Sequence, residues 1–377
     1  MGARARLSPH GSFLPALLVH GLADRLRGRR ARANARWGFI HAPAPSGKRL
    51  WIQAGAGRTA LRLAVATACA LRAKRLDVQF VLTFEEEHPD LLEPLAGLAR
   101  TGWGFAPCDH PRAVRRVLAR LEPLGVICVG APPRLNLAAA LHARSHLLVI
   151  AAPAGECAPE RVYPAMEAQA MGWPSATPLA PRADLLTLLT VAQVDPNFAA
   201  LVAPGGTPLW WWHGDDPAAA RDFADRFRAD MPDSILFVSG GAAAAAGPAL
   251  RLSQWDREPL PPCTRVCVDE PRWLPAVASC VRAAHLAASD RETLWQALAG
   301  GSAVSCGHAA ALPVAELAAA APALPDATDV LRRWREYRDN PIAARAAGDA
   351  ARRAFWQERR RAAEVSTELL DRVFEWN

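Results

Sequence analysis

The chain has 377 residues, of which 51% are hydrophobic, and this length suffices for two domains that each have a proper core. Its net charge of +7 is concentrated in residues 1–50, which carry ten Arg or Lys and a single acid, Asp24; the rest of the chain holds 34 basic and 36 acidic residues. A near-neutral body with a basic N-terminal segment argues against a broad nucleic-acid surface, so no nucleic-acid partner is expected.

Residues 1–36 are predicted to form a basic amphipathic segment that associates with a membrane. The apolar stretch 13–23 is too short to span a bilayer, and six arginines follow it between Arg25 and Arg36. An export signal carries its charges before the apolar stretch, so this order is wrong for a signal peptide. The pattern favours a helix on an anionic membrane surface. The alternative is a helix that packs on the first domain and exposes a solvated basic face.

Residues 37–180 alternate short apolar runs with helical patterns. The strands are expected at 50–54, 78–83, 126–129 and 146–151, and the helices at 59–74, 90–100, 111–122 and 135–144. Strand and helix in alternation imply a parallel sheet with helices on both faces. This part of the chain is therefore predicted to be a Rossmann-like N-terminal domain.

A second unit of the same type is expected at 205–340, after a linker near 172–207 that is rich in Pro and Gly. Its predicted strands are 209–212, 234–239, 265–269, one near 284–288, and 303–306, and its helices are 216–230 and 271–282. Long helices follow at 330–339 and 342–374, and residues 341–377 are expected to return toward the first domain. The prediction is an α/β protein of GT-B type, with two doubly wound Rossmann-like domains that face a cleft and C-terminal closing helices.

In doubly wound sheets, ligands bind beyond the carboxyl ends of the strands, so the loops that follow the strands are the candidate sites. The first such loop runs from Gly55 through Gly57 and Arg58 to Thr59. Glycines at a strand-to-helix turn expose backbone N–H groups that suit an anion, although the spacing is that of neither a P-loop nor a dinucleotide fingerprint. Thr59 alternatively serves as the N-cap of the next helix.

The second candidate loop is acidic. Glu85, Glu86 and Glu87 precede His88 and follow the strand at 78–83. A glutamate here could act as a general base toward an acceptor hydroxyl. The alternative is a solvated first turn of a helix, where carboxylates favour the helix dipole.

Two further candidate positions lie in the second half of the chain. His213, Gly214, Asp215 and Asp216 follow three consecutive tryptophans at a strand end. His213 could contact a phosphate or a sugar, and the aspartates could simply cap a helix. Arg291 and Glu292 begin another helix. They are interpreted either as contacts to the ribose or phosphate of a bound nucleotide or as a solvated helix start.

The cysteines indicate free thiols rather than a metal site. All eight are scattered, and no His or Cys pair completes a zinc set at suitable spacing. Buried thiols in a reducing cytosol are the simplest interpretation, and neither a metal nor a cofactor is expected.

Two segments carry a resemblance to a known family. Arg36-Trp37-Gly38, followed by Leu50–Thr59, resembles the start of the Kdo transferases, which add 3-deoxy-octulosonic acid to lipid A precursors. Residues 106–123, with Pro107, Asp109 and Pro111, resemble the family's Leu-Pro-Tyr-Asp segment and the helix after it. Thr59 stands where the resemblance places the family's general-base glutamate, and Gln53 stands where it places a histidine. Asn136 is what remains of an acidic acceptor loop.

The second half resembles the family less closely. Trp211 to Asp216 is similar to a Ser-Thr-His-x-Gly-Glu-Glu segment. Gly240, Gly241 and the alanines 242–246 replace a segment whose cations hold the sugar nucleotide. Asp269 is what remains of a further turn, and Trp295 takes the place of a glutamate after Arg291 and Glu292.

The resemblance implies a glycosyltransferase of lipopolysaccharide biosynthesis that transfers a CMP-activated sugar to a lipid A precursor, as a peripheral protein on the cytoplasmic face of the inner membrane. The implied donor contacts are His213, Gly214, Asp215, Gly240, Asp269, Arg291 and Glu292. The implied acceptor contacts are Gly57, Arg58 and Asn136. Because Thr59 cannot replace a glutamate, Glu85 and Glu86 are the candidate substitute bases.

Very slow or undetectable Kdo transfer is predicted for such a site. Two other functions stay open: an inactive homologue that acts as a scaffold or partner in envelope assembly, and a GT-B enzyme with a different nucleotide-sugar donor.

Overall fold

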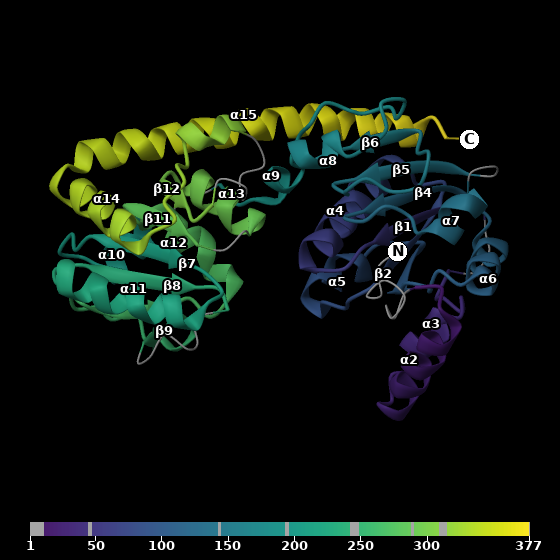
Figure 1. The fold of residues 1–377 in the computed structure, drawn as a ribbon, viewed down its shortest axis with the longest axis horizontal. Coiled ribbons are helices and arrows are strands. Elements are labelled where there is room, and N and C mark those ends of the chain that lie inside the picture. Colours follow the sequence, from purple (N-terminus) through teal and green to yellow (C-terminus); the bar gives the residue numbers. More distant parts are fainter. Residues whose placement is uncertain are drawn as a thin grey trace. The chain divides into compact units, whose positions relative to one another are not determined.

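The computed structural model describes residues 11–43, 47–141, 145–192, 196–241, 249–287, 290–308 and 315–376. The chain forms two compact units. Unit 1 comprises Met1–Leu185 together with Ala362–Asn377, and unit 2 comprises Leu186–Arg361. Each unit contains one parallel six-stranded sheet flanked by helices (Figure 1). The predicted α/β class with two Rossmann-like domains is therefore confirmed.

The sheet of unit 1 has the strand order β3-β2-β1-β4-β5-β6. Its strands are β1 Arg49–Ala54, β2 Gln79–Phe84, β3 Thr101–Phe105, β4 Pro123–Val129, β5 His146–Ile150 and β6 Arg161–Tyr163. The helices between them are α4 Arg58–Lys74, α5 Pro89–Ala96, α6 Pro111–Leu121, α7 Leu135–Leu141 and α8 Glu167–Met171. Strands β3 and β6 were not predicted, and the helix expected at 90–100 ends earlier, at Ala96.

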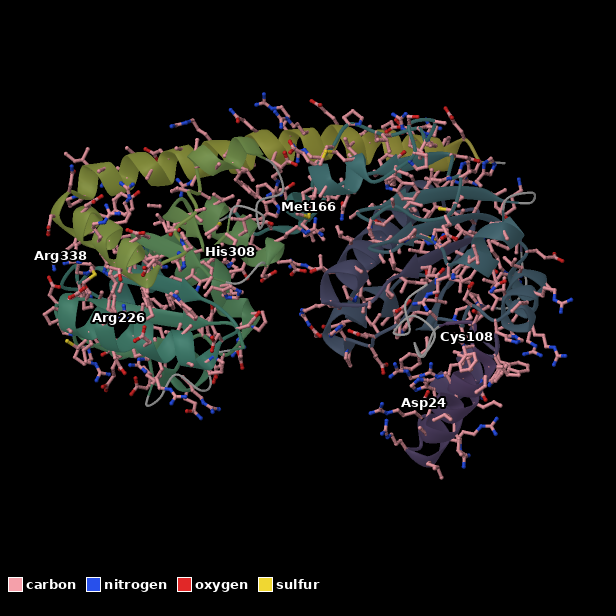
Figure 2. All side chains as sticks on the ribbon, in the orientation of Figure 1. Asp24, Cys108, Met166, Arg226, His308 and Arg338 are labelled. Atoms are coloured by element: carbon pink, nitrogen blue, oxygen red, sulfur yellow. The ribbon has the colours of Figure 1, made fainter. Side chains whose placement is uncertain are left out.

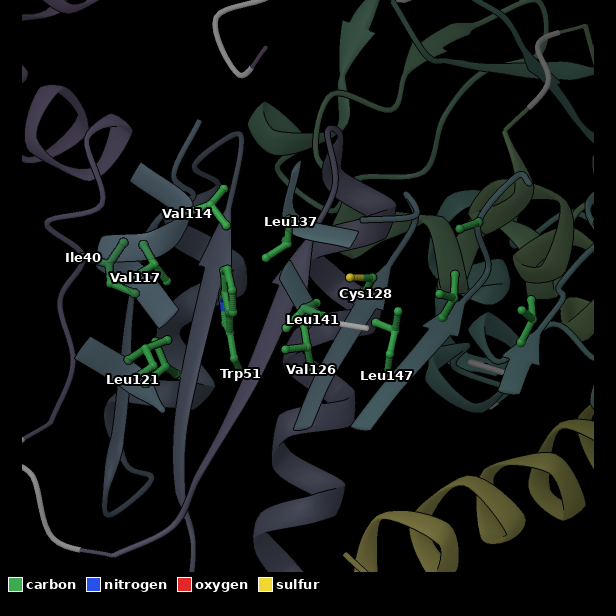
Figure 3. Packing of buried hydrophobic residues seen from close by; sticks show 14 of the residues in the cluster. Ile40, Trp51, Val114, Val117, Leu121, Val126, Cys128, Leu137, Leu141 and Leu147 are labelled. Atoms are coloured by element: carbon green, nitrogen blue, oxygen red, sulfur yellow. The ribbon is translucent and has the colours of Figure 1, made fainter. Parts of the chain in front are cut away.

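The core of unit 1 is organised around Trp51 in the central strand β1. The indole is fully buried and lies between side chains of α6, α7 and β4, as Figure 3 shows; these include Val114, Val117, Leu121, Val126 and Leu137. Its Nε1–H donates to Thr83 Oγ1 at 2.8 Å, so the one polar atom of the ring has a partner. A buried tryptophan of this kind fixes the register between the central strand and β2.

The sheet of unit 2 has the strand order β12-β11-β7-β8-β10-β9. Its strands are β7 Leu209–His213, β8 Ile235–Ser239, β9 Leu250–Arg251, β10 Arg265–Cys267, β11 Ala283–Leu286 and β12 Ala303–Cys306. Its α-helices are α9 Leu186–Leu189, α10 Pro196–Val202, α11 Pro217–Asp230, α12 Leu274–Cys280, α13 Arg291–Gly300, α14 Ala327–Asp339 and α15 Pro341–Phe374. The 3-10 helices among the residues described for this unit are η2 Leu252–Gln254, η3 Pro271–Trp273 and η5 Ala315–Ala319.

All three tryptophans of β7 are buried, because this central strand is covered on both faces. Trp210 and Trp212 pack in the cluster that contains Phe223 and Phe227 of α11 and Trp334 of α14. Trp211 points to the other face, as the alternation of a strand requires. The sheet thus uses the aromatic run as core on both sides.

The basic N-terminal segment forms a helix pair, α2 Leu14–Leu26 and α3 Arg30–Arg36. In Figure 1, α2 extends away from the sheet of unit 1. Asp24 of α2, labelled in Figure 2, pairs with Arg36 at 2.7 Å, and both side chains are buried. The prediction that Arg36 belongs to an exposed basic surface is therefore wrong, because its charge is used to join α2 to α3. None of the helices in the described parts of the chain is long and apolar enough to cross a membrane.

The end of α15 packs within unit 1. Buried Arg75 donates through Nη1 to the carbonyl oxygens of Val373, Phe374 and Trp376 at 2.9, 3.0 and 3.1 Å. The Trp376 ring stacks on His146 with centroids 4.9 Å apart. These contacts tie the last turn of the chain to the sheet that the first half builds.

Candidate functional site

Each sheet has one topological switch point, where the chain leaves one side of its first strand and continues on the other. In unit 1 this point lies between β1 and β4, and in unit 2 it lies between β7 and β11. Ligands of doubly wound sheets bind outside the carboxyl ends of the strands at such a crevice. The loops after Ala54, Val129, His213 and Leu286 are therefore the places at which to look for a site.

At the switch point of unit 2, His213 forms a buried cluster with its neighbours. His213 ends β7 and stands in register with Ser239, which ends β8. The Ser239 hydroxyl accepts a hydrogen bond from Trp211 Nε1 at 2.8 Å and lies 2.8 Å from His213 Nδ1. With Trp211 as donor, the serine proton is available for Nδ1, and we assign the imidazole proton to Nε2.

The free edge of the imidazole points toward the start of α13. His213 Nε2 lies 3.8 Å from the Asp290 carboxylate. Asp290 is the N-cap of α13 and accepts from the backbone N–H groups of Glu292 and Thr293 at 3.1 and 3.3 Å. Burial lowers the pKa of His213, while Asp290 and Asp215 oppose that effect. The ring is thus a neutral N–H donor at pH 7, held beside a helix N-terminus that favours anions.

Two glycine loops beside this cluster pack directly on each other. Gly240 follows β8 with φ +90°, and a Cβ there would strike the carbonyl oxygen of Gly214. The Gly241 N–H donates to Asp215 at 3.0 Å. Asp216 caps α11 by accepting from the Ala218 N–H at 2.8 Å, which confirms the capping interpretation for this residue. Gly214 and Gly240 therefore bring two backbone segments into close contact beside His213.

The other predicted donor contacts divide into two groups. Arg291 and Glu292 are half-buried in the first turn of α13, next to Asp290. Asp269 follows β10 and instead accepts hydrogen bonds from the backbone and the hydroxyl of Ser253. The alanines 242–246 lie outside the described residues.

In unit 1 the predicted glycine loop has a structural role. Gly57, not Thr59, is the N-cap of α4, and its φ of +92° suits glycine. Thr59 is the second helical residue and is half-buried. Its predicted capping role is wrong, because the turn closes two residues earlier. Arg58 forms an exposed ion pair with Asp90 at the start of α5.

The acidic loop after β2 does not contain three equivalent carboxylates. Glu85 is buried and forms an ion pair with Arg134, which lies just before α7. Glu86 and Glu87 are exposed, and Glu86 lies 4.0 Å from His88 Nε2. Glu85 is thus engaged in an ion pair, whereas Glu86 and Glu87 are open to solvent.

The backbone N–H and the side chain of Asn136 are both hydrogen-bonded to Asp109. Its backbone N–H and side-chain Nδ2 both lie 3.1 Å from Asp109 Oδ2, and Asp109 also accepts from the Leu137 N–H at 3.0 Å. Burial raises the pKa of Asp109, although these hydrogen bonds favour its charged form. Asp109 therefore holds the start of α7 in place.

A pocket of about 10 Å³ beside this carboxylate is lined by Trp51, Gln53, Asp109 and Arg134, among others. Gln53 Oε1 is buried and has no hydrogen-bond partner among the described residues. Gln53 stands in register with Thr83, as His213 does with Ser239. In both units a tryptophan two residues earlier donates to that hydroxyl. Gln53 is therefore the counterpart in unit 1 of His213.

The sequence did not identify Ser239, Asp290 and Arg134 as partners that complete the sites, and it indicated Asp109 only as part of the segment 106–123. Ser239 and Asp290 end a strand and begin a helix, so their positions gave a signal, but their pairing depends on strand register. Within the described parts of the chain, no group of three or more His, Cys, Asp or Glu side chains could hold a metal ion.

The sequence matches no protein-family model, and no curated protein sequence is similar to it. Solved structures are similar in fold. The UDP-GlcNAc 2-epimerase of Neisseria meningitidis, bound to UDP-GlcNAc, has a TM-score of 0.56 at 10% identity, covering 86% of this chain and 100% of that one. A glycosyltransferase from Rickettsia africae has a TM-score of 0.55 at 7% identity, covering 88% and 100%.

A third similar structure is UGT71G1 of Medicago truncatula in complex with UDP-glucose, with a TM-score of 0.52 at 8% identity, covering 87% of this chain and 98% of that one. Identities this low establish the architecture alone. Two Rossmann-like units with parallel sheets, shared with these proteins over most of both chains, give this chain the GT-B fold.

Proposed function

We propose that this protein binds a nucleotide-activated sugar at the His213 cluster of unit 2 and is a glycosyltransferase of GT-B type. The observation that supports this best is a neutral imidazole at the switch point, held by Ser239 and directed at the start of α13. Two of the similar structures were solved with UDP-sugars. The resemblance in residues 36–59 and 106–123 favours the narrower proposal that the donor is CMP-Kdo and the acceptor a lipid A precursor.

In this proposal the phosphates are held by one neutral donor and one cation. The Nε2–H of His213 supplies a hydrogen bond and Arg291 supplies a charge, while the N–H groups of Glu292 and Thr293 stay with the Asp290 cap. The close packing of Gly214 on Gly240 keeps side chains out of the way of the ligand. Glu292, in the first turn of α13, is the proposed contact to the ribose hydroxyls.

The chemical step is a displacement in which the acceptor hydroxyl attacks the anomeric carbon, the bond to the phosphate oxygen breaks, and a base takes the hydroxyl proton. Such a base contributes roughly 10²–10⁴-fold in rate. Thr59 cannot accept a proton at neutral pH, and Glu85 is paired with Arg134. We therefore propose that transfer is very slow. The same ion pair favours a second candidate function, a nucleotide-sugar-binding homologue without transferase activity.

Binding is tested by titrating the purified protein with CMP and with UDP in a calorimeter. Removal of a hydrogen bond to a charged phosphate costs about 10- to 100-fold in affinity, so His213→Ala should weaken binding by that factor. Asp290→Ala and Asp326→Ala both remove an N-cap aspartate, the first from α13 and the second from α14. Only Asp290→Ala should change the affinity for the nucleotide.

Absence of binding by both nucleotides would end the proposal. Binding of UDP without CMP would leave a GT-B donor site and exclude CMP-Kdo. Equal losses in the two capping variants would mean that the Asp290 effect comes from folding alone.

Transfer is tested with CMP-Kdo and a lipid A precursor. The wild type should turn over very slowly or undetectably, and the triple variant Glu85→Gln, Glu86→Gln, Glu87→Gln should abolish what remains. Thr59→Glu, at the position where the resemblance places the base, should raise the rate, with Thr101→Glu as an unrelated control. Rapid turnover by the wild type would refute the proposed weakness. An unchanged rate in the triple variant would refute the substitute base.

We also propose that α2 binds an anionic membrane surface. Leu18, Leu22 and Leu26 are spaced by four residues on one face of the helix, and they are 56%, 60% and 80% exposed. Four exposed arginines follow at or after the end of this helix, namely Arg25, Arg27, Arg29 and Arg30. An apolar face beside cations fits lipid with negative headgroups.

A further inference from the structure

A second cavity lies in unit 2 at the edge of the sheet opposite to His213. It measures about 450 Å³, which is within the range of small-molecule sites. Its walls are the turn before β7, the turn between α12 and β11, Gly301 before β12, and the first residues of α15. The five residues of β7 separate it from the His213 cluster by roughly 13 Å at 3.3 Å per residue, so the two sites are distinct.

The lining of this cavity is positively charged. Arg282 and Arg345 both line it, and the described residues around it include no acid. Thr207 supplies a hydroxyl group. Ser279 and Cys280 also line the cavity, and they donate to the carbonyl oxygens of Ala276 and Val277 at 2.8 and 3.2 Å. Two guanidinium groups with a hydroxyl group and no opposing carboxylate are suited to an anion with several oxygens.

Arg282 is held in place by the protein. Its Nη1 donates to the Arg338 carbonyl oxygen at 3.3 Å, and its guanidinium lies 6.0 Å from the centre of the Trp210 ring. Burial lowers the pKa of Arg282, and Asp233 partly opposes this. A guanidinium has five N–H donors, so the hydrogen bond to Arg338 leaves others for a ligand. Arg345, by contrast, is an exposed residue of α15 and can be replaced without disturbing a core.

We propose that this cavity binds the phosphate group of a small phosphorylated molecule, independently of the donor site. The planar fork of a guanidinium matches phosphate oxygens two at a time, and Arg282 and Arg345 enter from different elements. The ligand is small, because the space between these strand ends and helix termini is about 450 Å³. Its binding would stabilise unit 2 by mass action.

Cys280 provides a reporter inside the cavity. The purified full-length protein is treated with iodoacetamide, with and without glycerol 3-phosphate or inorganic phosphate, and alkylation of each cysteine is followed by peptide mass spectrometry. Cys263 is exposed and does not line the cavity, so it serves as the internal reference. Glycerol 3-phosphate at about ten times its Kd should slow alkylation of Cys280 by about tenfold and leave Cys263 unchanged. Protection by inorganic phosphate alone would identify the free ion as the ligand and would contradict an organic phosphate.

Arg345→Gln should raise the ligand concentration needed for half-protection by about tenfold, the equivalent of one charged hydrogen bond. Arg360→Gln, an exposed arginine further along the same helix, is the matched control and should change nothing. No protection of Cys280, or full protection in Arg345→Gln, would overturn the proposal. Loss of protection in His213→Ala would place the ligand at the donor site instead. That result would refute this second site and leave the proposed function intact.

Discussion

Two buried histidines stand on neighbouring strands of unit 2, and each lies beside a serine. His213 Nδ1 is 2.8 Å from Ser239 Oγ, and His285 Nδ1 is 3.1 Å from Ser305 Oγ. Burial lowers the pKa of both, and that of His285 to about 4. Of the two, His213 lies 3.8 Å from the Asp290 carboxylate at the carboxyl edge of the sheet, so we propose a ligand role for His213 and a packing role for His285.

The lowered pKa values predict how stability depends on pH. Between pH 6.5 and 4 the unfolded state binds a proton at His285 that the folded state does not, so the free energy of unfolding falls as the pH falls. Lowering the pKa of His285 from 6.5 to about 4 corresponds to about 3 kcal/mol in the free energy of unfolding. This stability is fully present above pH 6.5 and is lost as the pH falls to about 4. His285→Gln should flatten this part of the curve in urea unfolding measured from pH 7 to 4.

His308→Gln is the control, because His308 is exposed and its replacement should leave the slope unchanged. An identical slope in wild type and His285→Gln would show that the buried ring is not the source of the dependence. His213 acts in the same direction, so the double variant should be flatter still.

At the scale of elements, the sequence predicted correctly the strands that are buried on both faces of their sheet. The central strands β1 and β7 are mostly apolar, and their predicted lengths were close to those observed. Strand β3 was missed because Gly102 and Gly104 interrupt it and it is partly exposed at the sheet edge. The helix before it was predicted too long, since Gly97 ends it.

The candidate site was predicted only in part, for a related reason. His213 and Asp216 were recognisable because they follow a strand. The partnership of His213 with Ser239 depends on the register between two strands, and the pairing of Glu85 with Arg134 depends on two loops meeting. Neither leaves a local pattern, so sequence alone could not show that one candidate base is already occupied.

The exposed face of α2 gives a prediction at this scale. Burying a leucine side chain in an apolar environment contributes about 1.5–3 kcal/mol, so Leu18→Asp with Leu22→Asp should reduce binding to anionic vesicles by more than about 100-fold. Leu76→Asp is the matched control, because Leu76 is 72% exposed in unit 1 and lies outside α2. The measurement is co-sedimentation with vesicles of phosphatidylglycerol and of phosphatidylcholine. Equal binding to both lipids, or unchanged binding of the double variant, would contradict the proposal.

At the scale of the whole molecule, unit 1 is built from two separate parts of the chain. Arg75 is 5% exposed and donates to the carbonyl oxygens of Val373, Phe374 and Trp376. The Trp376 ring covers Gly125, where a Cβ would strike it. A buried guanidinium that loses its acceptors is costly. The C-terminal residues therefore belong to the core of unit 1 rather than to a tail.

Removal of residues 362–377 should destabilise unit 1 and spare unit 2. Hydrogen exchange followed by mass spectrometry should show faster exchange in β1, β4 and β5, with β7 and β8 unchanged. Trp376→Ala, which removes a ring that is 3% exposed, should produce a weaker form of the same effect. Trp356→Ala is the control, since that ring is 49% exposed on the unit 2 part of α15. Faster exchange throughout both sheets would refute the assignment of residues 362–377 to unit 1 alone.

This division inside α15 also sets an order of assembly on the ribosome. Unit 2 is encoded as one uninterrupted stretch, Leu186–Arg361, whereas unit 1 must wait for residues from Ala362 onward. At roughly 5–20 residues per second, synthesis of the intervening stretch takes on the order of ten seconds or more. During that interval Arg75 and the face around Gly125 are without their partners. Unit 1, which is synthesised first, is therefore completed last. A translation product that stops before residue 362 would expose Arg75 and the surface around Gly125.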